Sequence, residues 1–207
     1  LLFIIPSLDA GGGEKSLINL LSQINYDEYN VDLFLFKQEG LFIELLPKEV
    51  NILFLHEDYR LFSLPFYQSI KHLLLKRKLS LLYHRLLFML KNRMIKSTSI
   101  AEQKTWKHLS KAFRNIEKEY DAAIAFLEKT STYFCVDKVF AKKKIGWVHI
   151  DYDKLGMQPS LDYHYYQRLQ YIVTVSDECA NVMKNSFPTL KNKVQVIHNI
   201  VSPTTIQ

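Results

Sequence analysis

The chain has 207 residues, of which 48% are hydrophobic, and a formal net charge of +6 at pH 7. This length and apolar content suit one large α/β domain or two small ones and exclude a disordered chain. Only six Gly and six Pro occur, which disfavours an all-β sandwich; the two Cys form no CxxC pattern, so buried thiols in a reducing compartment are expected rather than a zinc site.

The predicted elements alternate between strands and helices along the chain. Strands are expected at 1–6, 31–36, 50–55, 122–126, 144–149, 171–175 and 194–197. Helices are expected at 13–25, 41–47, 64–96 (two helices), 101–119, 130–141, 160–169 and 177–186. Such alternation builds right-handed βαβ units. The prediction is a single α/β domain over 1–207, Rossmann-like and doubly wound, with a mainly parallel sheet of about seven strands, helices on both faces and a basic helical insertion at about 56–119.

The ends of the chain carry their own expectations. No apolar run is long enough to span a bilayer, and no charged leader precedes the first strand, so neither a membrane span nor a signal peptide is predicted. The sequence starts at Leu1 rather than Met, and its last residues follow a predicted strand without a closing helix. We therefore expect the chain to be part of a longer cytoplasmic protein.

The first strand leads into a glycine cluster. Residues 1–6 are almost entirely apolar, as in a strand buried on both faces of a parallel sheet. Gly11, Gly12 and Gly13 follow, and then an apolar pattern of helical spacing over 17–24. The bare N terminus of such a helix binds anions, most often phosphate. The alternative is a glycine cluster that only permits tight packing.

Three types of phosphate loop can be compared with this cluster. A P-loop needs Gly directly before Lys-Ser, where this chain has Glu14. A dinucleotide fingerprint needs G-x-G-x-x-G and an acidic residue at the end of the second strand, where this chain has Phe36, Lys37 and Gln38. The remaining type, a Gly-Gly-x-Glu loop that contacts the diphosphate of a sugar nucleotide, fits residues 11–14.

Three motifs follow one another along the chain. The first is PSLDAGGGEKSL at 6–17, and the second is WVHID at 147–151. The third combines 173–178, 187–188 and 196–201. In this order they resemble the N-terminal loop, the strand ending in a histidine at the interdomain cleft, and the run from the sixth strand to the interdomain linker of retaining GT-B glycosyltransferases of family 4.

The resemblance implies a two-domain enzyme. This chain would be its N-terminal, acceptor-binding half, and a C-terminal half absent from the sequence would hold the nucleotide-sugar donor, with no cofactor and no metal. Two positions depart from the family pattern: Gly13 at the third loop position, and Asn199-Ile200 where the linker usually has Asn-Gly. Residues 56–120 match no motif of the family.

The resemblance also implies roles for the loop and for one histidine. Gly11, Gly12 and Gly13 would let backbone amides approach the donor diphosphate, and His149 would contact the transferred sugar near the reacting carbon as the catalytic candidate. His149 ends a predicted parallel strand, where open α/β sheets bind ligands; a purely structural histidine is the alternative. Glu14 is a candidate acceptor contact, although an acid at a helix start also favours the helix dipole.

The other acceptor-site candidates follow predicted strands. They are Glu128, Thr130, Asp151 and Ser176. The alternative for these hydroxyl residues is helix capping, which is the more common role of Thr130 or Ser131 and is also expected of Ser176. Asp151 and Asp153 are two positions apart and do not converge on one ion, so no metal site is predicted.

The positive charge is concentrated in one segment. Nine basic residues and no acidic residue occur from Arg60 to Lys96, interleaved with leucines. Amphipathic helices of this kind bind anionic lipid surfaces, and each basic group there adds about 1 kcal/mol. Contact with an anionic membrane is expected through Lys71, Lys76, Arg77, Lys78 and Arg85; a helical insertion that packs on the domain is the alternative. No nucleic-acid-binding module is recognised, so nucleic acid is not an expected partner.

Together with these patterns, the family resemblance implies the N-terminal domain of a glycosyltransferase. It would move a sugar from a nucleotide-sugar donor to a glycan or lipid-linked acceptor in cell-surface polysaccharide synthesis, as a peripheral protein at the cytoplasmic face of the membrane. The alternative is a non-catalytic Rossmann-like domain that binds a phosphorylated ligand or a protein partner. A dehydrogenase is the third possibility; it would require NAD(P) binding, which titration could exclude.

Overall fold

The computed structural model describes residues 1–200, which form one parallel sheet of seven strands flanked by helices. The strands are β1 (Leu2–Ile5), β2 (Asp32–Leu35), β3 (Asn51–Ile52), β4 (Ile116–Ala125), β5 (Val139–Val148), β6 (Tyr171–Thr174) and β7 (Val194–Val196). The α-helices are α1 (Gly12–Leu21), α2 (Glu57–Ser63), α3 (Phe66–Leu75), α4 (Leu79–Met94), α5 (Thr98–Leu109), α6 (Thr130–Lys138), α7 (Pro159–Tyr166) and α8 (Asp177–Ser186). Short 3-10 helices lie at Ile43–Leu45, Ser110–Ala112 and Pro188–Lys193. The predicted Rossmann-like α/β class is confirmed.

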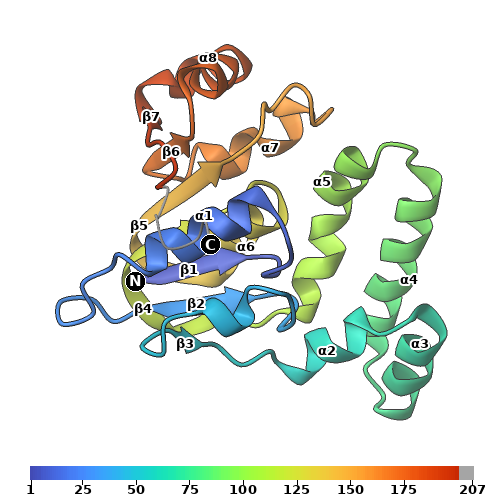
Figure 1. Ribbon diagram of the computed structural model, residues 1–207. Helices are drawn as coiled ribbons and strands as arrows, with labels where there is room; N and C mark the ends of the chain where they lie inside the picture. Colours follow the sequence, from blue (N-terminus) through green and yellow to red (C-terminus); the bar gives the residue numbers. More distant parts are fainter. Residues whose placement is uncertain (201–207) are drawn as a thin grey trace.

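The strand order places a change of direction beside β1. The order is β3-β2-β1-β4-β5-β6-β7, so the chain builds outward from β1 to one edge and then returns to build the other side from β4 (Figure 1). In open parallel sheets, ligands bind outside the carboxyl ends of the strands at such a switch point. The loops that follow β1 and β4 are therefore the first place to look for a site.

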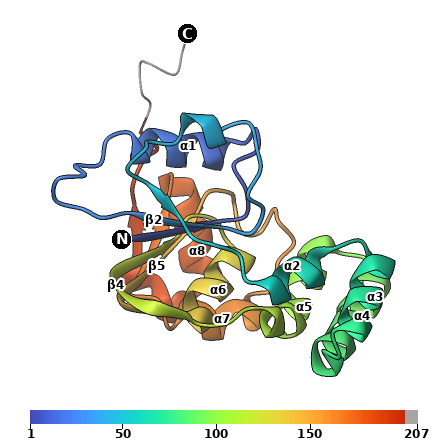
Figure 2. The same ribbon diagram turned by 90° about the horizontal axis from the view of Figure 1, so that it is seen from below.

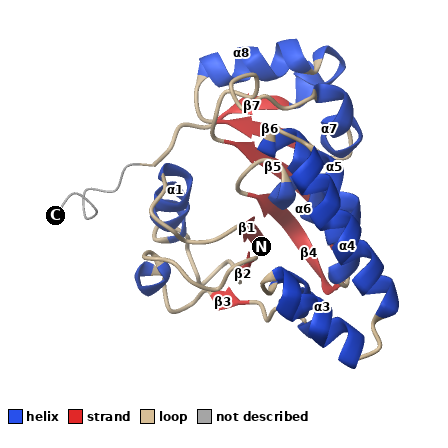
Figure 3. Cartoon of the chain, turned by 90° about the vertical axis from the view of Figure 1, so that its right-hand side faces the viewer, coloured by secondary structure: helices blue, strands red, loops and turns tan. Residues whose placement is uncertain are grey.

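Both faces of the sheet are buried under helices. In β1, Leu2 and Ile4 belong to one hydrophobic cluster and Phe3 and Ile5 to the other. Helix α1 covers the face of Phe3, whereas α5, α6, α7 and α8 lie on the face of Ile4 (Figures 2 and 3). An apolar strand with no polar alternation fits this double burial.

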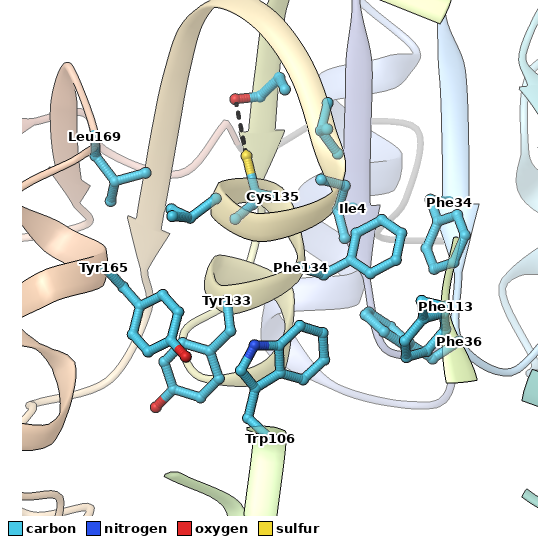
Figure 4. Close-up of a cluster of buried hydrophobic side chains, with 14 of the residues drawn as sticks. Ile4, Phe34, Phe36, Trp106, Phe113, Tyr133, Phe134, Cys135, Tyr165 and Leu169 are labelled. Carbon is cyan, nitrogen blue, oxygen red and sulfur yellow. Dashed lines mark hydrogen bonds between the residues drawn. The ribbon is translucent and has the colours of Figure 1, made fainter. Parts of the chain in front are cut away.

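The core on the α6 side is rich in aromatic rings (Figure 4). Phe34 of β2 stacks on Phe134 of α6 with ring centroids 4.2 Å apart, and Trp106 of α5 donates its indole N–H to Asp137 over 2.8 Å. Cys135 lies within this cluster as a buried free thiol. Cys179 is also free and buried, as the spacing of the two residues predicted.

Helices α2 to α5 form an arm between β3 and β4 (Figure 1). The arm is the helical insertion expected at about 56–119, but its helices end at Ala112. The expected helix at 101–119 is therefore wrong beyond that point. Phe113 adopts extended backbone and stacks on Tyr59 of α2 at 4.3 Å, which takes the chain out of the helix and into β4.

The outer halves of β4 and β5 were assigned to helices or left out by the sequence patterns. Ile116 pairs with Val139, and Tyr120 pairs with Ala141, so both strands start well before the apolar runs that predicted them. The expected helix at 130–141 accordingly ends at Lys138. Charged residues on an exposed strand pair give no apolar alternation from which a strand could be read.

Three smaller boundaries also differ. Helix α1 ends at Leu21, where the Tyr26 hydroxyl donates to the Leu21 carbonyl over 2.7 Å, rather than at residue 25. The helix expected at 41–47 is a single 3-10 turn, and the strand expected at 50–55 is the two-residue edge strand β3.

Candidate functional site

The loop between β1 and α1 is held by the segment that follows β2. Phe42 donates its backbone N–H to the Leu8 carbonyl over 2.9 Å. Gly40 has φ +139°, and a Cβ there would lie 2.4 Å from the Leu8 carbonyl carbon and oxygen. Within the loop, the Ser7 hydroxyl donates to Asp9 over 2.7 Å. Gly40 thus allows the close approach that shapes the loop, a role that the sequence did not predict.

The three loop glycines occupy different environments. Gly12 is the first residue of α1, and a Cβ on it would meet no atom of residues 1–200 within 4 Å. Gly11 is the N-cap, and a Cβ on it would lie 2.0 Å from Oε2 of Glu14, because the Glu14 side chain folds back over the helix start. The Glu14 carboxylate therefore lies at the positive end of α1, while open space lies beside Gly12.

His149 lies next to this loop from the end of β5. A Cβ on Gly13 would stand 3.8 Å from His149 Cγ and 2.9 Å from Leu127 Cδ2. The imidazole packs against Phe126 with ring centroids 4.8 Å apart. Burial lowers the pKa of His149 to about 4, so the ring is neutral at physiological pH. The glycine loop and His149 thus lie next to each other at one edge of the sheet.

Two buried nitrogen atoms near this edge lack partners. Neither His149 Nε2 nor Trp147 Nε1 has a hydrogen-bond partner within the described residues. The two rings lie 6.2 Å apart and are nearly parallel, because alternate residues of a strand share one face of the sheet. Buried polar atoms normally have partners, so these two unmatched nitrogens call for an explanation. The sequence did not predict Trp147 as a site residue, because an aromatic side chain in a predicted strand is expected in the core.

Glu128 connects the ends of β4 and β5. Its Oε2 accepts the backbone N–H of His149 over 3.4 Å, and the side chain is buried. Burial raises the pKa of the Glu128 carboxyl. A neutral imidazole and a carboxyl that retains its proton more readily than usual thus lie near the N terminus of α1.

Thr130, by contrast, is engaged in holding α6. Its hydroxyl donates to Glu102 Oε1 over 2.6 Å, and its backbone N–H donates to the same oxygen over 3.2 Å. The preceding residue, Lys129, has φ +59°, a conformation rare for a side chain other than Gly, and its Nζ lies 3.4 Å from Glu102 Oε2. Glu102 of the arm therefore caps α6, and nothing in the spacing of the sequence predicted this contact.

Asp151 and Ser176 meet at the start of α8. Ser176 is the N-cap and its hydroxyl accepts the backbone N–H of Cys179 over 3.2 Å, which is the helix-capping alternative. Asp151 accepts the Cys179 thiol over 3.2 Å and pairs with Lys154. In residues 1–200, no group of three or more His, Cys, Asp or Glu side chains could hold a metal ion.

The five basic residues expected at a membrane do not form one exposed set. Lys76 pairs with Glu57 and Lys78 pairs with Asp58, both from α2. Arg85 donates to the Leu64 carbonyl over 3.2 Å and lies over the rings of Phe62, Phe66 and Phe88 at 5.4–5.8 Å. Lys71 and Arg77 are exposed and form no ion pair in the described part of the chain. Among residues 1–200, each helix is too short or too polar to cross a bilayer.

No protein-family model and no curated protein sequence matches the chain. The resemblance to family 4 glycosyltransferases therefore remains a prediction from the three motifs.

The last described residues return to α1. The Ser16 hydroxyl donates to Asn199 Oδ1 over 2.7 Å, and Asn19 Nδ2 donates to the Ile200 carbonyl over 3.0 Å. The chain after β7 thus crosses to the helix that starts at the glycine loop. Val201, the last residue of the third motif, lies outside the described residues.

A separate cavity of about 540 Å³ lies near the amino ends of the strands. Its buried carboxylate, Asp32, accepts bonds from Lys118 over 2.8 Å, Asn51 over 2.8 Å and the Tyr120 hydroxyl over 2.7 Å. Because the chain itself supplies these donors, the Asp32 carboxylate is not left without partners, unlike His149 Nε2 and Trp147 Nε1 within residues 1–200.

Proposed function

We propose that this chain binds the diphosphate of a nucleotide sugar at the glycine loop and serves as the acceptor-side half of a retaining glycosyltransferase. The acceptor would be a glycan or a lipid-linked glycan in cell-surface polysaccharide synthesis on the cytoplasmic side. A C-terminal half, as the family resemblance implies, would supply most of the grip on the nucleotide.

The arrangement of Gly12 and His149 supports this proposal most directly. Gly12 starts α1 with open space beside it, and the partnerless Nε2 of His149 lies at the adjacent strand end. The first N–H groups of a helix have no partner within the helix and favour an anion. One ligand with a diphosphate and a sugar would use both features.

The side chains at this edge can be given distinct roles. His149 is neutral, so it can donate or accept a hydrogen bond to a sugar hydroxyl without placing a full positive charge beside the reacting carbon. Glu128, whose pKa is raised by burial, fixes the backbone of His149 and lines the same edge. Positive charge develops on the sugar as the diphosphate leaves. A neutral imidazole and a carboxyl group repel this charge less than a protonated histidine would.

Calorimetric titration of the chain with UDP, GDP, their sugar conjugates and NAD+ tests the binding step. We expect at least one nucleotide diphosphate to bind wild type, with Gly12→Ala weakening it and NAD+ giving no heat. Binding of NAD+ alone, or equal binding by Gly12→Ala, would contradict the proposal.

The proposed catalytic step requires a second domain that holds the donor, as the family resemblance implies. We expect the coding sequence beyond Gln207 to supply a second α/β half, and the two halves together to transfer sugar while the chain alone does not. Turnover by the chain alone would refute the two-domain enzyme. Diphosphate binding by a two-domain protein that transfers no sugar would favour the non-catalytic alternative.

A further inference from the structure

Helix α4 in the arm has two apolar faces. Its inner face packs on the other arm helices: Leu81 is buried, and Phe88 meets Phe62 of α2 edge to face at 5.4 Å. Its outer face carries a second row of apolar side chains, which we name the α4 stripe. The α4 stripe consists of Leu79, Tyr83, Leu86, Leu90 and Met94.

The α4 stripe is exposed along its whole length. Its members are between 38% and 80% exposed, and their spacing of three or four residues places them on one side of the helix. At 1.5 Å per residue the stripe is about 22 Å long. The neighbouring helix α3 adds Tyr67, Leu74 and Leu75, which are also exposed. Exposed apolar side chains in a row of this length are more than the scattered single residues that a surface normally carries.

The charged residues of α3, α4 and the turn between them are all basic. No Asp or Glu occurs from residue 59 to residue 101. Lys71 lies one turn from Tyr67 and Leu74 on α3, and Arg93 lies three positions after Leu90 on α4. Arg77 is exposed in the turn between the two helices. Of the residues that the structure describes, none forms an ion pair with these three cations.

We propose that the outer face of α3 and α4 lies on an anionic lipid surface. Hydrocarbon would receive the α4 stripe, lipid phosphates would face Lys71, Arg77 and Arg93, and Tyr67 and Tyr83 would sit at the level of the headgroups. A second copy of the chain is a poorer occupant, because pairing the stripe with itself would bring cations against cations. The contact runs along the surface, since α4 has only 16 residues.

This contact keeps Lys71 and Arg77 of the five basic residues that the sequence suggested, and replaces the other three with Arg93 and the α4 stripe. Lys76 and Lys78 already pair with carboxylates of α2, and Arg85 packs on three rings. Lipid binding by the outer face is also independent of nucleotide-sugar binding at the sheet edge, so either can fail without the other.

Vesicle flotation tests the proposal. The chain is mixed with vesicles of phosphatidylcholine alone or of equimolar phosphatidylcholine and phosphatidylglycerol. We expect flotation with the anionic vesicles, weaker at high salt, and little with the neutral ones. The double variant Leu86→Glu with Leu90→Glu should reduce the floated fraction about ten-fold, and the triple variant Lys71→Glu, Arg77→Glu, Arg93→Glu should do the same.

Matched controls come from exposed apolar residues outside the arm helices. Leu41→Glu with Phe54→Glu places the same charges at side chains that are 75% and 79% exposed, and should float as wild type does. Circular dichroism checks that each variant folds. Absence of flotation by wild type overturns the proposal, as does flotation that the stripe variant leaves unchanged. A concentration-dependent dimer abolished by the stripe variant, without lipid binding, would assign the surface to a second copy.

Discussion

The imidazole of His149 lies against the glycine loop, where a Cβ on Gly13 would stand 3.8 Å from His149 Cγ. Gly13, which has no side chain, therefore lets the start of α1 approach the residue that follows β5. The loop from β1 and the end of β5 share one surface, although more than 130 residues separate them in the sequence. Changes in the loop and at His149 can be tested by separate measurements.

Gly12→Ala should separate binding from folding. The added methyl group meets no atom of residues 1–200 within 4 Å, so the free energy of unfolding should stay constant or rise by about 0.5–1 kcal/mol. The same methyl group would stand in the space proposed for the diphosphate, and affinity for the nucleotide diphosphate should fall about ten-fold. Urea unfolding and calorimetric titration measure the two effects.

Gly40→Ala is the contrasting variant. Its Cβ would lie 2.4 Å from the Leu8 backbone at φ +139°, so it should lower the free energy of unfolding by about 2 kcal/mol. A stable Gly40→Ala chain would show that the loop is not held as described.

Glu14→Gln should strengthen anion binding. The Glu14 carboxylate folds over the start of α1 and competes with an incoming diphosphate for the helix end. Removing its charge should raise the affinity about two- to five-fold and destabilise the fold by roughly 0.3–1 kcal/mol. Titration with UDP and GDP at low salt measures the change. Weaker binding by the variant would instead assign Glu14 a direct contact with the ligand.

His149 should contribute to the pH dependence of stability. Its pKa in the folded chain is about 4, below the ordinary value of 6.5, so the unfolded chain binds more protons between these values. Its contribution is fully present above pH 6.5 and is lost as the pH falls toward about 4. Urea unfolding of wild type and His149→Gln over this range should give a steeper pH dependence for wild type.

His84 and His108 also have lowered pKa values from burial, and both remain in the His149→Gln variant, so the difference between the two proteins isolates His149. A titration of His149 near 6.5, observed by NMR, would contradict its burial.

Glu102→Ala should destabilise the domain. The change leaves the Thr130 hydroxyl and N–H without their acceptor and removes the counterion of Lys129, so we expect a loss of about 1–3 kcal/mol. Glu102→Gln keeps an acceptor for the Thr130 donors and should lower the free energy of unfolding by less.

Lys129→Gly should raise the free energy of unfolding by about 1 kcal/mol, because Gly relieves the positive φ. If Glu102→Ala, Glu102→Gln and Lys129→Gly all unfold in urea with the wild-type free energy, the cap does not stabilise the domain.

The parts of the fold that the sequence predicted are those with strong local patterns. Residues 1–6 and 171–175 are short apolar runs, and both are strands. The outer half of β4 was missed because Glu117, Lys118 and Glu119 carry no apolar alternation. Its pairing with β5, through Ile116 and then from Glu119 onward, forms only in the tertiary structure. Local pattern cannot report a pairing that forms at long range.

The candidate site also contains some features that the sequence predicted and others that it did not. The strand-end rule was sufficient to bring the glycine loop near His149. The cap that Glu102 provides to Thr130 spans 28 residues, and the missing partner of Trp147 Nε1 depends on which atoms surround the indole. Neither feature follows from residue spacing in the sequence, so both could be found only in the three-dimensional structure.

The bond between Glu102 and Thr130 has a consequence for how the domain unfolds. It joins the protruding arm to the turn after β4, where Lys129 holds an unfavourable conformation. Deleting the arm and joining β3 directly to β4 would therefore not leave an intact smaller domain, because the turn beside Glu128 would lose its support. Arm and sheet edge should melt together in a single cooperative transition, and the arm cannot be exchanged as an independent module.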